Sequence, residues 1–256
     1  MRRSTRWMER LGAVGFAVGL LLLWQLLAST KVISPLFFPS PVRTMEALWA
    51  QMAHGQLWQP LTSTLSRMAW GWFVASVLGV VLGALISSSD LVRRMTHPLL
   101  EFMRPLPASA IIPVAILAFG LSSTMSTSVI AFGSIWPVLL ASVQGFSAVD
   151  ERLREVASVM RFGTLERFVK VNLPSAMPGI LAGARVGLSV ALILAVVTEM
   201  QASLTGIGQN ILMAQRSFKT PDLYAGVVVL GAIGFVTSAA IQAVENRVLR
   251  WRNSAR

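Results

Sequence analysis

The sequence contains no cysteine and few charged residues. Without cysteine in a chain of 256 residues, disulfide bonds, thiol catalysis and cysteine-ligated metals are excluded. Only two histidines are present, His54 and His97, so a histidine-rich metal site is not expected either. Charged residues make up 13% of the chain, against roughly 25% in a typical soluble domain. Since 54% of the residues are hydrophobic, the composition indicates an integral membrane protein rather than a globular enzyme.

In place of charged residues, the sequence contains long apolar runs. A spanning helix needs about 20 mainly apolar residues, and six segments of this kind occur, separated by short connections. We therefore expect an all-α, polytopic membrane protein in one domain, residues 1–256. Its predicted spans are 11–29, 61–87, 100–120, 127–146, 175–202 and 223–244.

The basic N-terminus ahead of an apolar run is also typical of a secretory signal. The apolar part of such a signal has about 7–15 residues, whereas the run from Leu11 to Ala28 is longer and ends without a clear small-x-small cleavage site. We interpret it as a retained first transmembrane helix.

The net charge of +11 is explained by membrane topology without nucleic acid. With a cytoplasmic N-terminus, the inside segments 1–10, 88–105, 147–174 and 245–256 hold sixteen Lys and Arg residues, and the outside segments hold four. Such an excess marks the cytoplasmic side, so both termini are predicted inside.

Glycines at four-residue spacing mark places where membrane helices can approach closely. They form two pairs, Gly15 with Gly19 and Gly79 with Gly83, and a run of three, Gly179, Gly183 and Gly187. Glycine is also simply common in membrane helices, so the run of three is the more specific signal.

The segment 150–174 is strongly charged and lies between apolar runs. Apolar residues recur with helical spacing from 150 to 162, and Gly163 is suited to end that helix in the left-handed conformation. Thr164 can cap a second short helix, and Pro174 suits the start of the next one. The pattern leaves two interpretations open: an amphipathic loop on the membrane surface, or a docking element for a soluble partner.

The same segment resembles the cytoplasmic coupling loop of bacterial ABC importer permeases, which begins with Glu-Ala-Ala, contains a glycine and closes with Leu-Pro. The residues that match are Glu155, Val156, Ala157, Val171, Leu173 and Pro174. Further segments resemble the nitrate, sulfonate and taurine permease family in the right order along nearly the whole chain. They are Phe37–Leu48, Met103–Gly120, Trp136–Asp150, Leu173–Leu188 and Thr198–Gly208.

One departure concerns the turn of the loop. The family's glycine usually stands six residues after the glutamate, where this chain has Arg161. Since Gly163 follows two residues later, we predict that the turn is shifted to Gly163.

The resemblance implies the transmembrane subunit of an ATP-driven importer in a bacterial inner membrane. It implies two ATP-binding ABC subunits, a second permease copy and a periplasmic or lipoprotein substrate-binding protein. ATP and Mg would bind to the partner ATPase, and no cofactor to this chain, which has no Gly-x-x-x-x-Gly-Lys-Ser/Thr phosphate loop. The implied coupling-loop residues are Glu155, Ala157, Arg161, Gly163, Phe168, Leu173 and Pro174.

Arg67, Arg185 and Glu199 fall within predicted spans, where ionisable groups face the protein interior or a water-filled cavity. Arg67 and Glu199 lie at a similar depth near the outside, so they either pair with each other or reach the interface separately. Arg185 lies in the inner part of its span, where it either attracts an anionic substrate near the exit or holds the loop through hydrogen bonds to backbone carbonyls.

By resemblance, the solute is a small anion or organic acid such as a sulfonate, taurine or nitrate. Related permeases carry aromatic acids, bicarbonate or vitamin precursors, and these stay open. An ion-coupled secondary transporter would need acidic or histidine relays within the spans, and only Glu199 qualifies. A membrane enzyme would need clustered catalytic groups, and no such cluster is visible in the sequence.

Overall fold

The computed structural model describes residues 2–30, 33–103 and 106–250, and within these ranges the chain is helical with short connections. The longest helices are α1 (Arg2–Ser29), α3 (Trp58–Ser87), α6 (Ser123–Ser147), α9 (Leu173–Ala202) and α11 (Thr220–Val248). Shorter elements connect them: α2 (Pro41–Ala53), α4 (Asp90–Met103), η1 (Ala108–Ile111), α5 (Ile112–Phe119), α7 (Glu151–Val159), α8 (Thr164–Arg167), η2 (Phe168–Asn172) and α10 (Ile207–Arg216).

Side-chain caps define where several of these helices begin. The Ser122 hydroxyl accepts a hydrogen bond from the Met125 N–H at 3.1 Å at the start of α6. The Ser40 hydroxyl accepts one from the Arg43 N–H at 3.3 Å at the start of α2. Each cap satisfies a backbone donor that the first helical turn leaves free.

Helix α6 lies between α3 and α9, and glycines bring the three backbones together. A Cβ at Gly79 would lie 3.0 Å from Val138, and one at Gly183 would lie 2.7 Å from the Pro137 carbonyl oxygen. The second glycine pair and the run of three thus have the packing role predicted for them. Gly15 and Gly19 in α1 have nothing within 4 Å of a Cβ.

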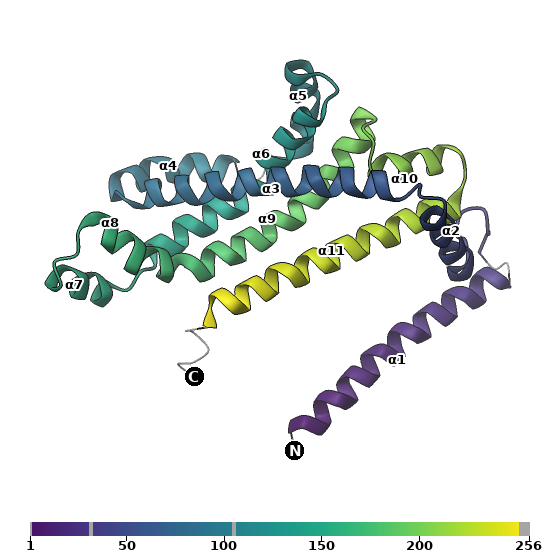
Figure 1. Ribbon diagram of the computed structural model, residues 1–256, viewed down its shortest axis with the longest axis horizontal. Coiled ribbons are helices and arrows are strands. Elements are labelled where there is room, and N and C mark those ends of the chain that lie inside the picture. Colours follow the sequence, from purple (N-terminus) through teal and green to yellow (C-terminus); the bar gives the residue numbers. More distant parts are fainter. Residues whose placement is uncertain (1, 31–32, 104–105, 251–256) are drawn as a thin grey trace.

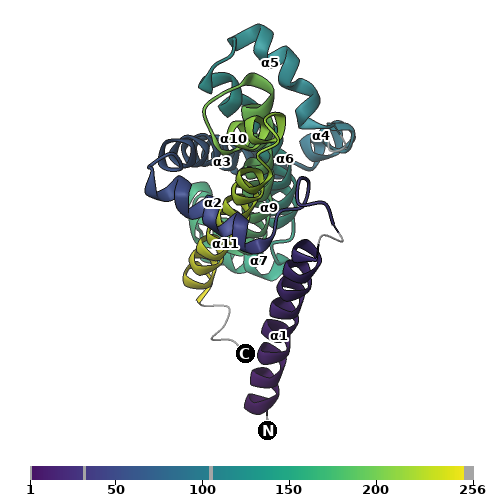
Figure 2. The same cartoon turned by 90° about the vertical axis from the view of Figure 1, so that its right-hand side faces the viewer.

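Helix α1 stands apart from this bundle in both views (Figures 1 and 2). Its outer part reaches the rest of the chain through Trp24, whose ring centroid lies 5.9 Å from that of Tyr224 in α11. The first turn of α1 and the last turn of α11 lie on the side away from α2 and α10 (Figure 1).

Four helical stretches are long and apolar enough to cross a membrane: α3, α6, Thr164–Ala202 and α11. They contain the spans predicted at 61–87, 127–146, 175–202 and 223–244. The predicted span 100–120 is divided, because α4 and the η1–α5 segment lie at 83° to each other; if this bent pair is one span, there are five. Pro107, extended at φ −70° and ψ 109°, precedes η1, and residues 104–105 of the predicted span lie outside the described residues. The apolar stretch Gly15–Ser29 of α1 is shorter, so the count of six spans stays a prediction.

Candidate functional site

The charged segment folds as a helix, a turn and a second helix at the end of the molecule where α3 ends and α9 begins (Figure 1). Asp150 caps α7, since its Oδ1 accepts a hydrogen bond from the Arg152 N–H at 3.0 Å. After the turn, α8 continues through one π-helical turn, η2, into α9 without interruption. The second short helix is therefore continuous with the membrane helix α9, and a displacement of one moves the other.

The turn itself lies at Arg161, so the prediction that Gly163 makes it is wrong. Arg161 has φ +52°, in the left-handed region, whereas Gly163 is extended at φ −64° and ψ 165° and is the N-cap of α8. The Phe162 N–H donates to the Ala157 carbonyl and the Arg161 N–H to the Ser158 carbonyl, both at 3.0 Å. These two bonds define a Schellman motif, which requires a left-handed residue at the position of Arg161. The left-handed turn therefore lies at the position where the family has its glycine, six residues after Glu155, and this chain has an arginine there.

Glu166 fastens the start of α8. One carboxylate oxygen accepts from the Gly163 N–H at 3.3 Å and the other from Lys170 Nζ at 3.0 Å. The bond from Lys170, helped by the Gly163 N–H, lowers the pKa of this exposed carboxyl. Lys170 also lies 5.0 Å from the centroid of the Phe162 ring and so connects the turn to η2.

Phe168 anchors the loop to the membrane helices. Its ring stacks on Phe146 of α6, with centroids 5.7 Å apart and planes 24° apart. Leu173 and Phe168 pack against a small core that contains Phe146, Ala176 and Ile180. Ala157 is buried, and Pro174 is the second residue of α9, directly after the π-helical turn η2.

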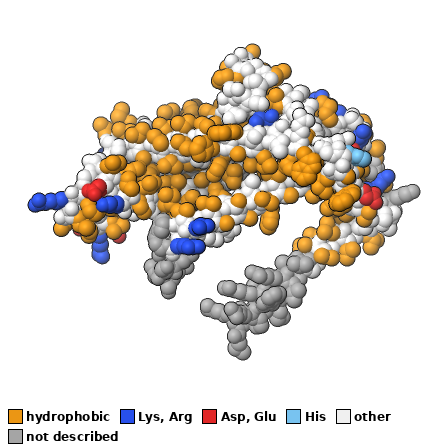
Figure 3. Space-filling view, in the orientation of Figure 1, with side chains coloured by type: hydrophobic (Ala, Val, Ile, Leu, Met, Phe, Trp, Pro, Cys, Tyr) orange, Lys and Arg blue, Asp and Glu red, His pale blue; other side chains and the backbone are white. Residues whose placement is uncertain are grey.

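The outward side of the loop is apolar and uncovered in the part of the chain that the structure describes. Val159 and Leu165 are 82% and 77% exposed, and Val156 and Met160 are exposed as well. Glu155 and Arg161 are exposed among them. Figure 3 shows charged side chains gathered around this end, and hydrophobic side chains over the middle of the molecule. The arrangement suits a protein partner that covers apolar residues surrounded by charge.

At the opposite end of the bundle, Arg67 and Glu199 form the ion pair that the sequence left as one of two alternatives. Arg67 Nη2 lies 2.7 Å from Glu199 Oε1, and the side chains are 8% and 0% exposed. Arg67 Nη2 also donates to the Thr205 carbonyl at 2.5 Å, and Glu199 Oε2 accepts from the Gly208 N–H at 2.9 Å. The pair therefore joins α3, α9 and the start of α10.

Gly206 and Gly208 make room for this pair, a role the sequence reasoning missed. A Cβ at Gly206 would overlap the Glu199 carboxylate, and one at Gly208 would lie 2.5 Å from the Val196 carbonyl oxygen. Thr64 adds a contact, since its hydroxyl accepts from the Ile207 N–H at 3.0 Å. Two glycines within ten residues of an acidic residue in a span were the available signal.

Within the described residues, Arg185 contacts a side chain of α11 and not the loop carbonyls of its structural alternative. Its guanidinium forms an ion pair with Glu245 of α11, a residue that the sequence reasoning did not single out. Both side chains are partly exposed. The predicted topology placed Glu245 in the inside segment that follows the last span, and Arg185 ten residues into its own span. Across the described ranges, no group of three His, Asp or Glu residues could hold a metal ion.

Helices long and apolar enough to cross a membrane, joined by an exposed helix–turn–helix at one end, define a polytopic membrane protein. The fold is shared with solved importers. The chain superposes on the MetNI methionine ABC transporter with a TM-score of 0.64 at 18% identity, covering 75% of this chain and 95% of that one. An amino acid ABC transporter gives 0.61 at 17% identity, covering 79% and 97%.

Residues 75–250 match the family described as binding-protein-dependent transport system inner membrane component, and the chain belongs to this family. It is thus an ABC transporter permease. A permease named for aliphatic sulfonates, SsuC of Bacillus subtilis, is 32% identical over 94% of this chain and 89% of its own. The taurine permease TauC of Escherichia coli is 29% identical over 93% and 89%. The bicarbonate permease CmpB of Synechococcus elongatus is 27% identical over 96% and 93%.

Proposed function

We propose that this permease forms the translocation path of an ATP-driven importer for a small anion or organic acid, of the sulfonate, taurine or nitrate kind. A substrate-binding protein outside the membrane delivers the solute, and two ABC ATPases bind and hydrolyse ATP with Mg. Two copies of the permease form the path between them. The chain is multi-pass in a bacterial inner membrane, and both termini are cytoplasmic.

The observation that carries the proposal is the apolar, uncovered side of the 150–174 loop. Its backbone is fixed by the Schellman motif at Arg161, and its core side is fixed by the stacking of Phe168 on Phe146. A rigid surface with Val159 and Leu165 outward is suited to a groove on a soluble partner. A helix lying on the membrane surface is the alternative, but it would not need the sharp turn of the loop.

The continuity of α8, η2 and α9 gives the loop a mechanical connection to the membrane helices. Because the loop runs into a membrane span with no break, a movement imposed on α8 by ATP-driven closure of the ATPases tilts α9. Helix α6 follows, since Gly183 of α9 lies against its backbone at Pro137. This coupling converts ATP hydrolysis into alternating access.

The solute class rests on the relatives, whose names give sulfonates, taurine and bicarbonate. Bicarbonate is therefore the nearest alternative, and aromatic acids or vitamin precursors are further ones. An ion-coupled transporter is disfavoured, because Glu199, the one acidic candidate for a relay, is buried in an ion pair with Arg67.

The test is co-purification of the ATPase encoded with this permease. Serine at both Val159 and Leu165 removes the exposed apolar contacts and leaves every hydrogen bond of the turn in place. We expect this double variant to lose most of the bound ATPase and the ATP-dependent uptake. As a matched control, V236S and F235S change two exposed apolar residues of α11 and should keep the ATPase. If the loop variant, or a variant in which residues 151–172 are deleted, still binds the ATPase, the proposal is wrong.

A further inference from the structure

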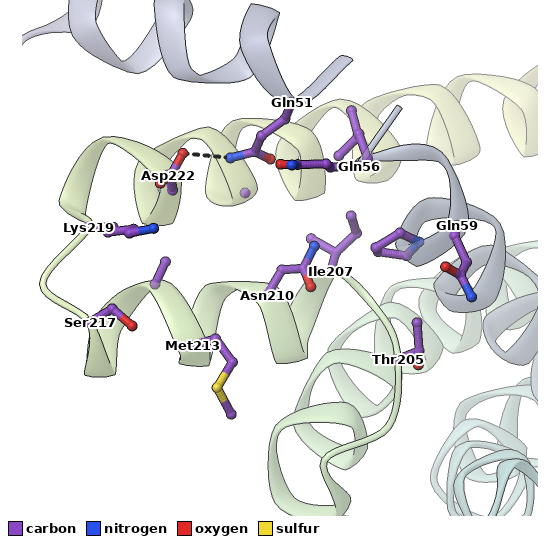
Figure 4. A pocket seen from close by; sticks show the side chains of 14 residues that line it. Gln51, Gln56, Gln59, Thr205, Ile207, Asn210, Met213, Ser217, Lys219 and Asp222 are labelled. Carbon is purple, nitrogen blue, oxygen red and sulfur yellow. Dashed lines mark hydrogen bonds between the residues drawn. The ribbon is translucent and has the colours of Figure 1, made fainter. Parts of the chain in front are cut away.

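A polar pocket lies at the end of the molecule opposite the loop. It has a volume of about 520 Å³, within the range of roughly 300–1,000 Å³ for small-molecule sites. It is formed by α2, the start of α3, the turn before α10, α10 itself and the start of α11 (Figure 4). Its polar lining residues are Gln51, Gln56, Gln59, Thr205, Asn210, Ser217, Lys219 and Asp222. We call this the outer pocket, because these residues lie in segments predicted on the outer side of the membrane, opposite the cytoplasm.

The pocket contains one cation and one anion that do not neutralise each other. Lys219 and Asp222 both line it, yet neither is in any ion pair within 4.0 Å over the described ranges. Asp222 Oδ1 accepts a hydrogen bond from the Gln51 amide at 2.9 Å, which orients the carboxylate without adding a charge. In Figure 4 the Lys219 side chain extends from the turn after α10 into the space between α10 and the start of α11.

The backbone beneath Lys219 is fixed. Phe218 has φ +54°, in the left-handed region, and the Lys219 N–H donates to the Ala214 carbonyl at 2.9 Å. With the Phe218 N–H donating to the Gln215 carbonyl at 3.2 Å, this is a second Schellman motif closed by a residue other than glycine. A strained backbone conformation of this kind is often found at functional sites, and here it places the ammonium over the pocket.

We propose that the outer pocket binds a small zwitterion, with its anionic group on Lys219 and its ammonium on Asp222. The amides of Gln56, Gln59 and Asn210 supply neutral donors and acceptors around the remaining polar atoms. A compact molecule with two opposite charges satisfies both side chains at once, whereas a simple anion leaves the carboxylate without a counter-charge. The inference rests on the proposed function in one respect, since the pocket is taken as an outer waiting site for the transported solute.

The experiment measures binding by calorimetry to the full chain, assembled with its ATPase in lipid nanodiscs without the substrate-binding protein. The probes are taurine, which carries both charges, and ethanesulfonate, which lacks the ammonium. The wild type should bind taurine more tightly. K219Q should weaken both probes by about tenfold or more, as expected for the loss of one hydrogen bond to a charged group. D222N, which keeps the shape of the side chain, should weaken taurine alone.

Arg216 provides the matched control, because it is an exposed cation three residues before Lys219 that does not line the pocket. R216Q should leave both affinities unchanged. Equal binding of the two probes by the wild type, no effect of K219Q, or an equal loss in R216Q would each overturn the inference. Uptake by the complete importer in proteoliposomes separates the two claims. If the wild type transports its solute but the pocket variants change neither binding nor uptake, only the inference fails. If the wild-type importer transports no small anion or organic acid, the proposed function fails.

Discussion

The buried pair Arg67–Glu199 should be a major source of stability for the outer half of the bundle. The two side chains are 8% and 0% exposed and 2.7 Å apart, and removal of either leaves the other charge buried without a counter-charge. Such a loss costs roughly 3–5 kcal/mol. Since 1 kcal/mol shifts Tm by about 2–4 °C in a chain of this size, R67M or E199Q alone should lower Tm by roughly 6–20 °C.

The double variant R67M/E199Q tests whether the pair, and not each residue separately, is responsible. It buries no charge, and the amide oxygen of the new glutamine side chain can still accept the hydrogen bond that Glu199 accepts from the Gly208 N–H. The double variant should therefore lose less free energy of unfolding than the two single variants together. The difference, which is the coupling energy of the pair, should be about 2–3 kcal/mol, near the upper end for residues in contact. A charge exchange is not the right rescue, because Gly206 lies too close to the Glu199 carboxylate for an arginine to fit there.

The assay is thermal unfolding of the detergent-solubilised chain, followed by size-exclusion chromatography with fluorescence detection. R185M is the control, because the Arg185–Glu245 pair is partly exposed and should contribute only about 1 kcal/mol or less. If the double variant loses as much Tm as the two single variants together, the ion pair is not the reason for their instability.

Three further predictions concern the turns and the loop. R161G should keep ATPase binding and raise the stability of the turn by up to about 1–2 kcal/mol, the cost of a left-handed residue with a side chain; a fall in Tm would show that the Arg161 side chain itself is needed. G206A should abolish folded protein in the chromatography assay, because the added methyl group would overlap the Glu199 carboxylate. G163A, with nothing within 4 Å of the added methyl group and a negative φ, should be tolerated. Equal yields of folded protein from the two variants would contradict the close contact between Gly206 and Glu199. The pKa of Glu166 is lowered in the folded loop, so the contribution of Glu166 to the stability of the loop is present above the unfolded value of 4.5 and is lost as pH falls through the folded pKa. Proteolysis of the loop should therefore rise in that acidic range in the wild type. E166Q should be cleaved readily at neutral pH, with little further change on acidification.

The long helices and the helix–turn–helix of the loop followed from local patterns. Apolar runs located α3, α6, α9 and α11, and the spacing from Glu155 to Pro174 located the helix–turn–helix. The turn was misplaced because a propensity rule favours glycine at left-handed positions, whereas the two backbone bonds of the Schellman motif hold Arg161 there despite its side chain. Bonds of this kind depend on the geometry of the whole turn, which residue preference alone does not give.

The ion pairs between distant helices could be predicted only in part from the sequence. Similar depth suggested the pair of Arg67 with Glu199, whereas Arg185 was predicted inside a span and Glu245 after one, so their pairing was not expected. The division of the 100–120 segment into two helices at 83° reflects the packing of α5 beside α6, and hydropathy does not report it. The outer pocket joins residues from α2, α10 and α11, so it exists only once the fold has brought them together.

The most direct test of the account is cross-linking of the loop to the ATPase. Because the chain has no cysteine, a single one can be introduced at any position without removing others. L165C, at a residue 77% exposed on α8, should cross-link to the ATPase through a short bifunctional reagent, and the yield should change with ATP. F218C, 64% exposed at the opposite end, is the matched control and should give no such product. Cross-linking at Phe218 and none at Leu165, in a complex that contains the ATPase, would contradict the account.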